Sequence, residues 1–281
     1  MSPTPAEPGM TVQFWGVRGS IPTPRADSIR YGGNTLCLQI RIPGFGEHLV
    51  IDAGTGIREL GGTLPDRAVV HLMLSHYHWD HLQGLPFFQP LYSPDTRITI
   101  YSSRESEETQ TILRGQMSQP YFPLRFDAAA SAREYRRYPP PGTEFQIGPA
   151  AVRTIPLHHP QGSLGFRFEV GGAVLVHVSD HEHGDPDIDH AVAAAAEGAD
   201  LLVYDAQYTT EEYETRRGWG HSTWAEGVRI AKQSGARRLL MIHHDPWHND
   251  DFIDGMVAQA RESFENVDAA REFTTYHVQA G

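Results

Sequence analysis

The segment LSHYHWDH at residues 74–81 decides the fold of this 281-residue chain. An apolar run leads into it and predicts a buried strand that ends where the polar residues begin. Residues i and i+2 of an extended chain point the same way, so His76 and His78 can converge on one cation. Asp80 and His81 come one turn later and can face a second cation beside the first. Four residues of metal-ligand type within six positions therefore predict a metal site where this strand ends.

Residues of the same type follow three other predicted strands, again at the carboxyl end. They are His158 and His159 after Ala151–Ile155, Asp180 after Val174–Val178, and His243 and His244 after Leu239–Ile242. Open α/β sheets place their ligands at this end of the strands. The chain has 16 histidines, a count that is weak evidence alone, but the shared position gives these residues one expected meeting point. Either histidine of each adjacent pair could be the ligand; we choose His243 because it directly follows its strand.

Both halves of the chain place predicted strands before predicted helices. The strands are Val12–Val17, Thr35–Ile42, His48–Ile51, Ala68–Leu74, Arg97–Tyr101, Ala151–Ile155, Leu164–Val170, Val174–Val178, Leu201–Tyr204 and Arg238–Ile242. The helices cover about Ile57–Leu60, Glu105–Gln116, Asp187–Glu197, Thr223–Ser234 and Phe252–Phe264. This order predicts two sheets packed together with helices outside. Residues 117–142 are irregular and rich in aromatic residues, so we expect a surface excursion, with a lid or a dimer contact as the functional alternative.

The composition fits one large folded domain. Apolar residues make up 40% of the chain, so we expect a single domain over residues 11–281 after a flexible, proline-rich arm at residues 1–10. The net charge of −12 argues against a polynucleotide partner, which would need a basic surface. The single cysteine, Cys37, excludes an intrachain disulfide and a cysteine-based zinc site. The sequence has neither a membrane-spanning apolar run nor a signal-peptide pattern, so a cytoplasmic location is expected.

With these motifs the chain resembles the metallo-β-lactamase-fold hydrolases. The resemblance rests on residues 74–81, on the downstream His159 and Asp180, and on the late His243. Within that superfamily the chain looks most like the branch that holds ribonuclease Z and the phosphonate-pathway cyclic phosphodiesterases. The segments that suggest this branch are GSLGFR at residues 162–167, GHST at residues 220–223, YGGNT at residues 31–35 and DAGTG at residues 52–56. The resemblance implies an α/β (α+β) fold, namely a four-layer αββα sandwich with a dinuclear metal site on one edge.

The resemblance also implies a role for each ligand candidate. The first metal would be bound by His76, His78 and His159, the second by Asp80, His81 and His243, and Asp180 would bridge the two. His159 is chosen over His158 because residues 162–165 follow it at the distance found in the family. This nitrogen and oxygen donor set fits two divalent cations, zinc first, with manganese or iron as alternatives. They would hold a bridging hydroxide that attacks the phosphorus of the substrate.

The histidine of the GHST segment, His221, is expected to act in catalysis without binding a metal. In the resembled branch this residue contacts the scissile phosphate and protonates the leaving oxygen. A histidine at a helix start, with Ser222 or Thr223 as the cap, is the alternative interpretation. Asp205 ends a predicted strand and is expected to orient His221, unless it is only a turn residue. We place Asp80, besides its role as a ligand, with these two among the catalytic residues.

Other polar residues receive supporting places. Asp52 and Asn34 are expected to hold ligands in position, and His181 and His183 are expected at the rim of the site. The aromatic side chains of residues 117–142 would stack on a base of the substrate. The nearby arginines that would meet a phosphate are Arg133, Arg136 and Arg137.

The predicted activity is that of a dinuclear-metal phosphodiesterase acting on a small phosphodiester, such as a cyclic nucleotide. Ribonuclease Z usually carries a long arm that grips transfer RNA between the third histidine and the bridging aspartate. Here only 180 − 159 − 1 = 20 residues separate His159 from Asp180. The alternatives are lactone or thioester hydrolysis on the same metals, transfer-RNA 3′ processing, and a non-catalytic metal-dependent ligand sensor. A homodimer is an open alternative to a monomer, because similar proteins commonly dimerise.

Overall fold

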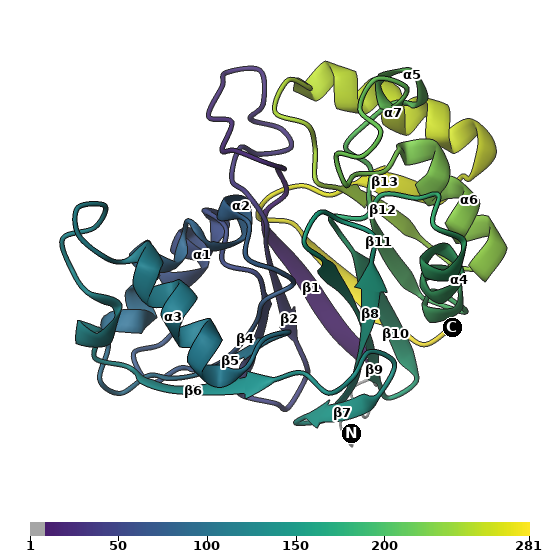
Figure 1. The fold of residues 1–281 in the computed structure, drawn as a ribbon. Coiled ribbons are helices and arrows are strands. Elements are labelled where there is room, and N and C mark those ends of the chain that lie inside the picture. Colours follow the sequence, from purple (N-terminus) through teal and green to yellow (C-terminus); the bar gives the residue numbers. More distant parts are fainter. Residues whose placement is uncertain (1–8) are drawn as a thin grey trace, which may run out of the picture.

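The computed structural model describes residues 9–281, and fourteen strands form its centre (Figure 1). Residues 1–8 of the expected arm lie outside the described residues, and its last two residues, Gly9 and Met10, begin the first strand. The strands are β1 (Gly9–Gly16), β2 (Cys37–Arg41), β3 (His48–Ile51), β4 (Val69–Met73), β5 (Arg97–Ser102), β6 (Ala132–Arg137), β7 (Glu144–Ile147), β8 (Ala150–Leu157), β9 (Ser163–Val170), β10 (Ala173–Val178), β11 (Leu201–Asp205), β12 (Leu239–Ile242), β13 (Val267–Ala269) and β14 (Thr275–Gln279). They form two seven-stranded sheets, in the orders β14-β1-β2-β3-β4-β5-β6 and β13-β12-β11-β10-β9-β8-β7.

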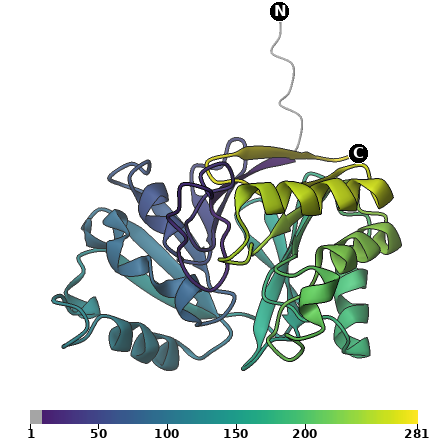
Figure 2. The same cartoon turned by 90° about the horizontal axis from the view of Figure 1, so that it is seen from above.

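The helices cover the outer faces of the two sheets (Figure 2). They are α1 (Gly56–Gly61), α2 (Trp79–Leu82), α3 (Ser106–Gln116), α4 (Pro186–Ala195), α5 (Thr210–Tyr213), α6 (Trp224–Ser234) and α7 (Asp250–Ser263). Side-chain caps begin α4, α6 and α7. Thr223 accepts a hydrogen bond from the backbone N–H of Glu226 at the start of α6, and Gly235 ends that helix with φ of 67°. No helix among residues 9–281 is long and apolar enough to cross a membrane.

The apolar core falls into three clusters, which separate four layers. One cluster lies between the two sheets and includes Phe14, Phe166 and Leu240. A second packs α1 and α3 on the first sheet, and a third packs α4, α6 and α7 on the second sheet. Buried apolar residues between stacked layers supply the main driving force for such an architecture. The predicted four-layer αββα sandwich is therefore confirmed.

The strand directions bring the predicted ligands to one edge of the sandwich. Strands β10, β11 and β12 pair in parallel, so their carboxyl ends coincide. Strand β8 runs in the same direction as β10, because both pair antiparallel to β9 between them. In the first sheet, β3, β4, β5 and β6 are parallel as well. The loops after β4, β8, β10, β11 and β12 meet at this edge (Figure 1).

Six residues of the stretch at 117–142, which was expected to be irregular, form a strand of the first sheet. Strand β6 pairs in parallel with β5 and forms the edge of that sheet. Its sequence AREYRR is mostly charged because only one side of the strand is hydrogen-bonded and its side chains are largely exposed. Phe126 is buried in the cluster beneath α3. The three arginines already have partners, since Arg133 donates to the carbonyl of Ala129, and Arg136 and Arg137 pair with Glu134 and Glu105. A contact of any of them with a phosphate stays a prediction.

Candidate metal centre

Three histidine rings form the first group of ligand atoms. His76 and His78 lie on the turn between β4 and α2, and His159 follows β8. Their ligand atoms all lie within 4.8 Å of one another. Nδ1 of His78 and Nε2 of His159 are only 3.0 Å apart. These are the three residues predicted for the first metal, and the structure brings them together.

The far side of each of these rings is tied to a hydrogen-bond acceptor. The ring of His159 donates from Nδ1 to the carbonyl of Gly220 at 2.8 Å, and the ring of His78 donates from Nε2 to Oε1 of Gln161 at 2.8 Å. Nδ1 of His76 lies 3.0 Å from Oγ of Ser75. With their outer nitrogens held in this way, the rings turn Nδ1 of His78 and Nε2 of His159 toward each other, where both atoms can bind one cation.

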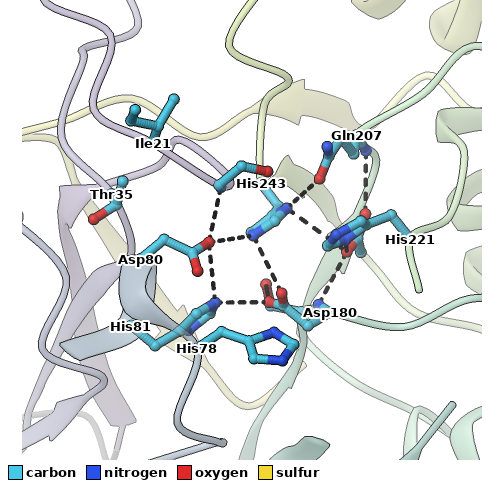
Figure 3. A network of polar contacts seen from close by, with 12 residues as sticks. Ile21, Thr35, His78, Asp80, His81, Asp180, Gln207, His221 and His243 are labelled. Carbon is cyan, nitrogen blue, oxygen red and sulfur yellow. Dashed lines mark hydrogen bonds and ion pairs between the residues drawn. The ribbon is translucent and has the colours of Figure 1, made fainter. Parts of the chain in front are cut away.

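The second group contains two carboxylates and two histidines. Its members are Asp80, His81, Asp180 and His243, all buried, with ligand atoms within 4.8 Å of one another (Figure 3). Nε2 of His243 lies 3.3 Å from Oδ2 of Asp80 and 3.3 Å from Oδ1 of Asp180. Nε2 of His81 lies 3.2 Å from Oδ2 of Asp180 and 3.4 Å from Oδ2 of Asp80. These are the residues predicted for the second metal together with the predicted bridge.

Asp180 lies between the two groups. Its Oδ1 is 3.9 Å from Nε2 of His76 and 3.8 Å from Nε2 of His159, both members of the first group. The same carboxylate faces both histidines of the second group. A side chain with this position can contribute one oxygen to each of two neighbouring cations, as predicted for a bridge.

Buried acceptors also hold the outer nitrogens of the second group. Nδ1 of His81 lies 2.8 Å from Oδ2 of Asp52, and Nδ1 of His243 donates to Oε1 of Gln207 at 2.6 Å (Figure 3). Asp52 also accepts hydrogen bonds from the backbone and the hydroxyl of Ser75, so it fixes both sides of the site, as predicted. Such partners set the tautomer and the direction of a metal-binding histidine.

The arrangement fits divalent cations on two observations. Nε2 of His76 and Nε2 of His81 are buried and have no hydrogen-bond partner among the described residues. A buried polar atom without a partner costs free energy, and one cation in each group would satisfy these two nitrogens. Ligand atoms of one tetrahedral zinc ion lie about 3.4 Å apart, close to the separations found here. The donors are nitrogen and oxygen alone.

The charge differs between the two groups. Burial lowers the pKa of His76, and it lowers the pKa of His159 to about 4, so these rings are neutral and free to bind a cation. Burial alone would also lower the pKa of His243, but the carboxylates of Asp180 and Asp80 raise it to about 9. Burial would raise the pKa of Asp180, yet the neighbouring His243 and His81 hold it well below its usual value. The two buried carboxylates of the second group therefore attract positive charge.

The backbone is strained at two of the ligands. Asp180 has φ of 60° and His243 has φ of 64°, values that residues other than glycine rarely adopt. Two glycines make room for the rings: a Cβ on Gly19 would overlap the ring of His243, and a Cβ on Gly220 would overlap the ring of His159. Strain of this kind persists where a functional geometry requires it.

The geometry selects one histidine from each adjacent pair. His158 is exposed and its Nδ1 faces the carbonyl of Glu182, away from both groups. His244 is buried, its Nε2 lies 3.0 Å from the carbonyl of Ala270, and its ring packs edge-on against Tyr31. His159 and His243 are thus the members that join the ligand groups, as chosen from the sequence.

His221 lies beside the ligands and is held by Asp205. Nδ1 of His221 is 3.0 Å from Oδ2 of Asp205, which is fully buried at the end of β11. The ring of His221 stacks on that of His243 with 4.6 Å between centroids. Thr223 caps α6, as the alternative interpretation of this segment expected, so the helix start leaves the role of His221 open and its contacts with Asp205 and His243 carry the catalytic interpretation. One of its ring nitrogens also lies close enough to the ligand atoms of His159 and Asp180 to share a metal ion with them. Metal binding is therefore the alternative role that an experiment must exclude.

Two supporting predictions are wrong. Asn34 donates to Glu272, so its side chain does not hold a ligand. His181 is buried at 1% exposure against Tyr204 and α4, because the chain turns inward after Asp180, so it is not at the rim. Sequence reasoning also missed Gln207, whose only signal is its position two residues after a strand end.

A pocket on the other side of α2 uses the aromatic residues of the segment after α3. It has a volume of about 710 Å³, and its walls include Trp79, Tyr121 and Phe122. None of the seven predicted ligands lines it. The role of this segment as a lid or dimer contact stays a prediction.

Comparison with known proteins gives four findings. A family model described as the beta-lactamase superfamily domain matches residues 47–244. A ribonuclease Z of Limosilactobacillus fermentum is 23% identical over 265 residues, which cover 77% of this chain and 83% of that protein. The solved structure of the metallo-beta-lactamase fold protein YhfI from Bacillus subtilis superimposes with a TM-score of 0.75 at 21% identity, over 97% of this chain and 100% of that one. A structure described as a new diphosphatase from the PhnP family gives a TM-score of 0.70 at 18% identity, over 95% and 97%.

Proposed function

Because the chain belongs to the beta-lactamase superfamily, as a metal-dependent hydrolase of the ribonuclease Z-like branch, we propose that it is a phosphodiesterase for small phosphodiesters such as cyclic nucleotides. The observation that carries the proposal is the buried pair of Asp205 and His221 beside the metal centre. Hydrolysis of an alkyl phosphodiester expels an alkoxide, which leaves poorly unless an acid protonates it. Hydrolysis of a lactone or a thioester does not need this second acid.

The metal centre supports the same chemistry. We propose that His76, His78 and His159 hold one zinc ion and Asp80, His81 and His243 another, with Asp180 between them; manganese and iron also suit these donors. Two such cations, when bound, lower the pKa of water and neutralise charge that builds on the phosphoryl oxygens. The protein contributes fixed ring directions and a buried, anionic setting.

The proton would be carried by His221. Its Nδ1 is occupied by the carboxylate of Asp205, so Nε2 is the atom that can present a proton to the leaving oxygen. The hydrogen bond to the Asp205 carboxylate keeps the ring from rotating. Asp80 would act through the cation that it binds.

The short segment between His159 and Asp180 favours a small substrate. Residues between His159 and Asp180 form only the hairpin of β9 and β10, with no inserted arm. The net charge of −12 adds a penalty for a long polyanion. Transfer-RNA processing is therefore the less favoured reaction, and we propose a cytoplasmic enzyme for small diesters.

A pair of substrates tests the proton donor. We expect His221→Ala to lower kcat for 3′,5′-cyclic AMP by about 10²–10⁴-fold, because its leaving group is an alkoxide. The loss should be much smaller with bis(p-nitrophenyl) phosphate, whose leaving group needs no proton. His183→Ala is the control. His183 contacts Ser222, the residue that follows His221 in the chain, and it lies outside the ligand groups.

The same proteins are analysed for bound metal. Unchanged metal content in His221→Ala supports a proton donor, whereas loss of metal together with activity would make His221 a ligand. Metal-loaded protein that hydrolyses neither diester would contradict the phosphodiesterase and favour a lactonase, a thioesterase or a sensor.

A further inference from the structure

A second pocket of about 400 Å³ opens directly beside His221. Its buried floor includes Tyr208 and His221. Its mouth carries Ile21, Trp219 and Trp247, which come from three different loops. In Figure 3, His221 lies to the right of His243 and Ile21 lies above and to its left, whereas His78 lies below it. We call this the indole pocket, after the two tryptophans.

The mouth of the indole pocket exposes an unusual amount of aromatic surface. Trp247 is 81% exposed and Trp219 is 61% exposed. The chain has five tryptophans, and among the described residues the only other strongly exposed one is Trp79. Exposed aromatic surface next to a reactive site is typical of a ligand-binding surface.

Both tryptophans sit on loops that buried charges hold in place. The guanidinium of Arg18, fully buried, donates from Nη1 to the carbonyls of Asp245 and His248 at 3.2 and 2.7 Å, on either side of Trp247. The carboxylate of Glu182 accepts hydrogen bonds from the backbone of Gly218 and Gly220, at 2.7 and 2.8 Å, on either side of Trp219. A loop fixed in this way offers its indole at a constant place, which lowers the entropy cost of binding.

We infer that the indole pocket binds the leaving group of the substrate, and that this group carries a planar aromatic ring system of nucleobase size. The inference rests on the proposed phosphodiesterase function. It follows from the position of His221, since a proton donor lies next to the oxygen that it protonates. The atoms attached to that oxygen then lie on the same side, between Trp219 and Trp247.

The reaction balances simply. Water loses one proton and adds its oxygen to phosphorus, the bond from phosphorus to the leaving oxygen breaks, and His221 gives that oxygen a proton, which solvent then restores to the ring. A linear diester gives a phosphomonoester and an alcohol, whereas a cyclic diester keeps both groups in one product. In either case the indole pocket holds the part that carries the new hydroxyl group. Stacking on an aromatic side chain contributes about 1–3 kcal/mol per base.

The charges of the indole pocket favour a neutral ring over a second phosphate. The guanidinium of Arg216 lies over the ring of Tyr208 and 3.5 Å from the carboxylate of Glu212, so its charge is already paired. The carboxylate of Asp245 accepts the backbone N–H of Trp247. The larger pocket with Trp79 and Tyr121 lies away from His221 and is the rival place for a base.

The direction of cleavage tests the inference. The probe is the 5′-methylphosphate diester of deoxyadenosine, in which both leaving oxygens are primary alkoxides of similar basicity. If the base lies in the indole pocket, the products are deoxyadenosine and methyl phosphate. If the base lies elsewhere, the products are deoxyadenosine 5′-phosphate and methanol, and the inference is overturned.

Two variants of equally exposed aromatic residues locate the base. We expect Trp247→Ala to lower kcat/KM for this diester by about 5- to 100-fold and to leave an analogue without the base unchanged. Tyr121→Ala, also 81% exposed in the wild type, is the matched control and should have no effect. The opposite pattern would place the base in the larger pocket.

A binding measurement separates this inference from the proposed function. Isothermal titration of metal-loaded protein with deoxyadenosine should show binding that Trp247→Ala weakens at least fivefold. If no diester is hydrolysed but this binding is found, the phosphodiesterase proposal fails, and the indole pocket is still a binding site for an aromatic base. If the diester is hydrolysed and neither its products nor deoxyadenosine binding depends on Trp247, the pocket inference fails and the function stands.

Discussion

Oδ2 of Asp205 lies 3.0 Å from Nδ1 of His221 and also accepts a hydrogen bond from the backbone N–H of Asp180 at 2.9 Å. One carboxyl oxygen thus ties the proposed proton donor to the residue that lies between the two ligand groups. Burial alone would raise the pKa of Asp205, but the neighbouring His221 holds it below its usual value. Asp205 is therefore charged at neutral pH and can orient a protonated ring.

Asp205→Asn tests the positioning role of this carboxylate. The amide can still bond to the backbone of Asp180, but it no longer stabilises a positive His221, so we expect kcat for 3′,5′-cyclic AMP to fall by about 10- to 1,000-fold. The pH profile of kcat should shift with it, whereas a purely structural role would change stability alone. Thermal unfolding of both proteins is the control, and a kcat that keeps its value would contradict the role.

Gln207→Ala should weaken the binding of the second cation, because the substitution removes the acceptor that fixes the ring of His243. Loss of such a partner typically costs about 10- to 100-fold in metal affinity. Competition with a chelator measures the change. Gln161→Ala is the matched control: Gln161 holds His78 from an exposed position, where water replaces it, so a smaller effect is expected. Equal losses from both variants would contradict this explanation.

Gly19→Ala is expected to displace the ring of His243 without removing any ligand. The added Cβ would overlap that ring, which Gln207 prevents from moving aside. We expect at least tenfold weaker binding of one of the two cations. Gly46→Ala, where the Cβ meets nothing within 4 Å, is the control and should bind metal like the wild type.

The ligand set could be predicted from the sequence because its residues follow buried strands. The apolar runs of β4, β10 and β12 mark where each strand ends, and parallel strands bring these ends together. The choice of His159 and His243 over their neighbours also agrees with the structure. The local sequence pattern was sufficient to place those residues whose position depends only on their own strand.

The rest depends on contacts between distant segments, which no local pattern contains. The edge strands β6 and β14 were missed because their exposed sides allow polar residues, as in AREYRR. Gln207 has no motif, and its role appears only when β11 and β12 lie side by side. The indole pocket is formed by three loops, of which the first lies more than 190 residues before the other two in the sequence. The aromatic side chains at residues 117–142 suggested another place for a base.

His177 should make the stability of the fold depend on pH. It is buried inside β10, and burial lowers its pKa to about 4, below the value of about 6.5 that it has when unfolded. The unfolded chain therefore takes up the proton first as the pH falls, so the stabilising contribution present above pH 6.5 is lost toward pH 4. From pH 7 to pH 5 this residue should cost about 2 kcal/mol of unfolding free energy.

Urea unfolding of His177→Leu at the two pH values measures this contribution. Relative to the wild type, the variant should gain about 2 kcal/mol on going from pH 7 to pH 5. His190→Leu, on the exposed side of α4, is the control. The free energies of unfolding of His177→Leu and the wild type could instead differ by the same amount at both pH values. That result would show that His177 is not a buried neutral ring.

The most direct measurement of the central claim is anomalous diffraction from crystals of the zinc-loaded protein, combined with metal analysis of the same sample. We expect two ions per chain, one among His76, His78 and His159 and one among Asp80, His81 and His243, with the carboxylate of Asp180 reaching both. A single ion, or an Asp180 side chain turned away from the pair, would contradict it.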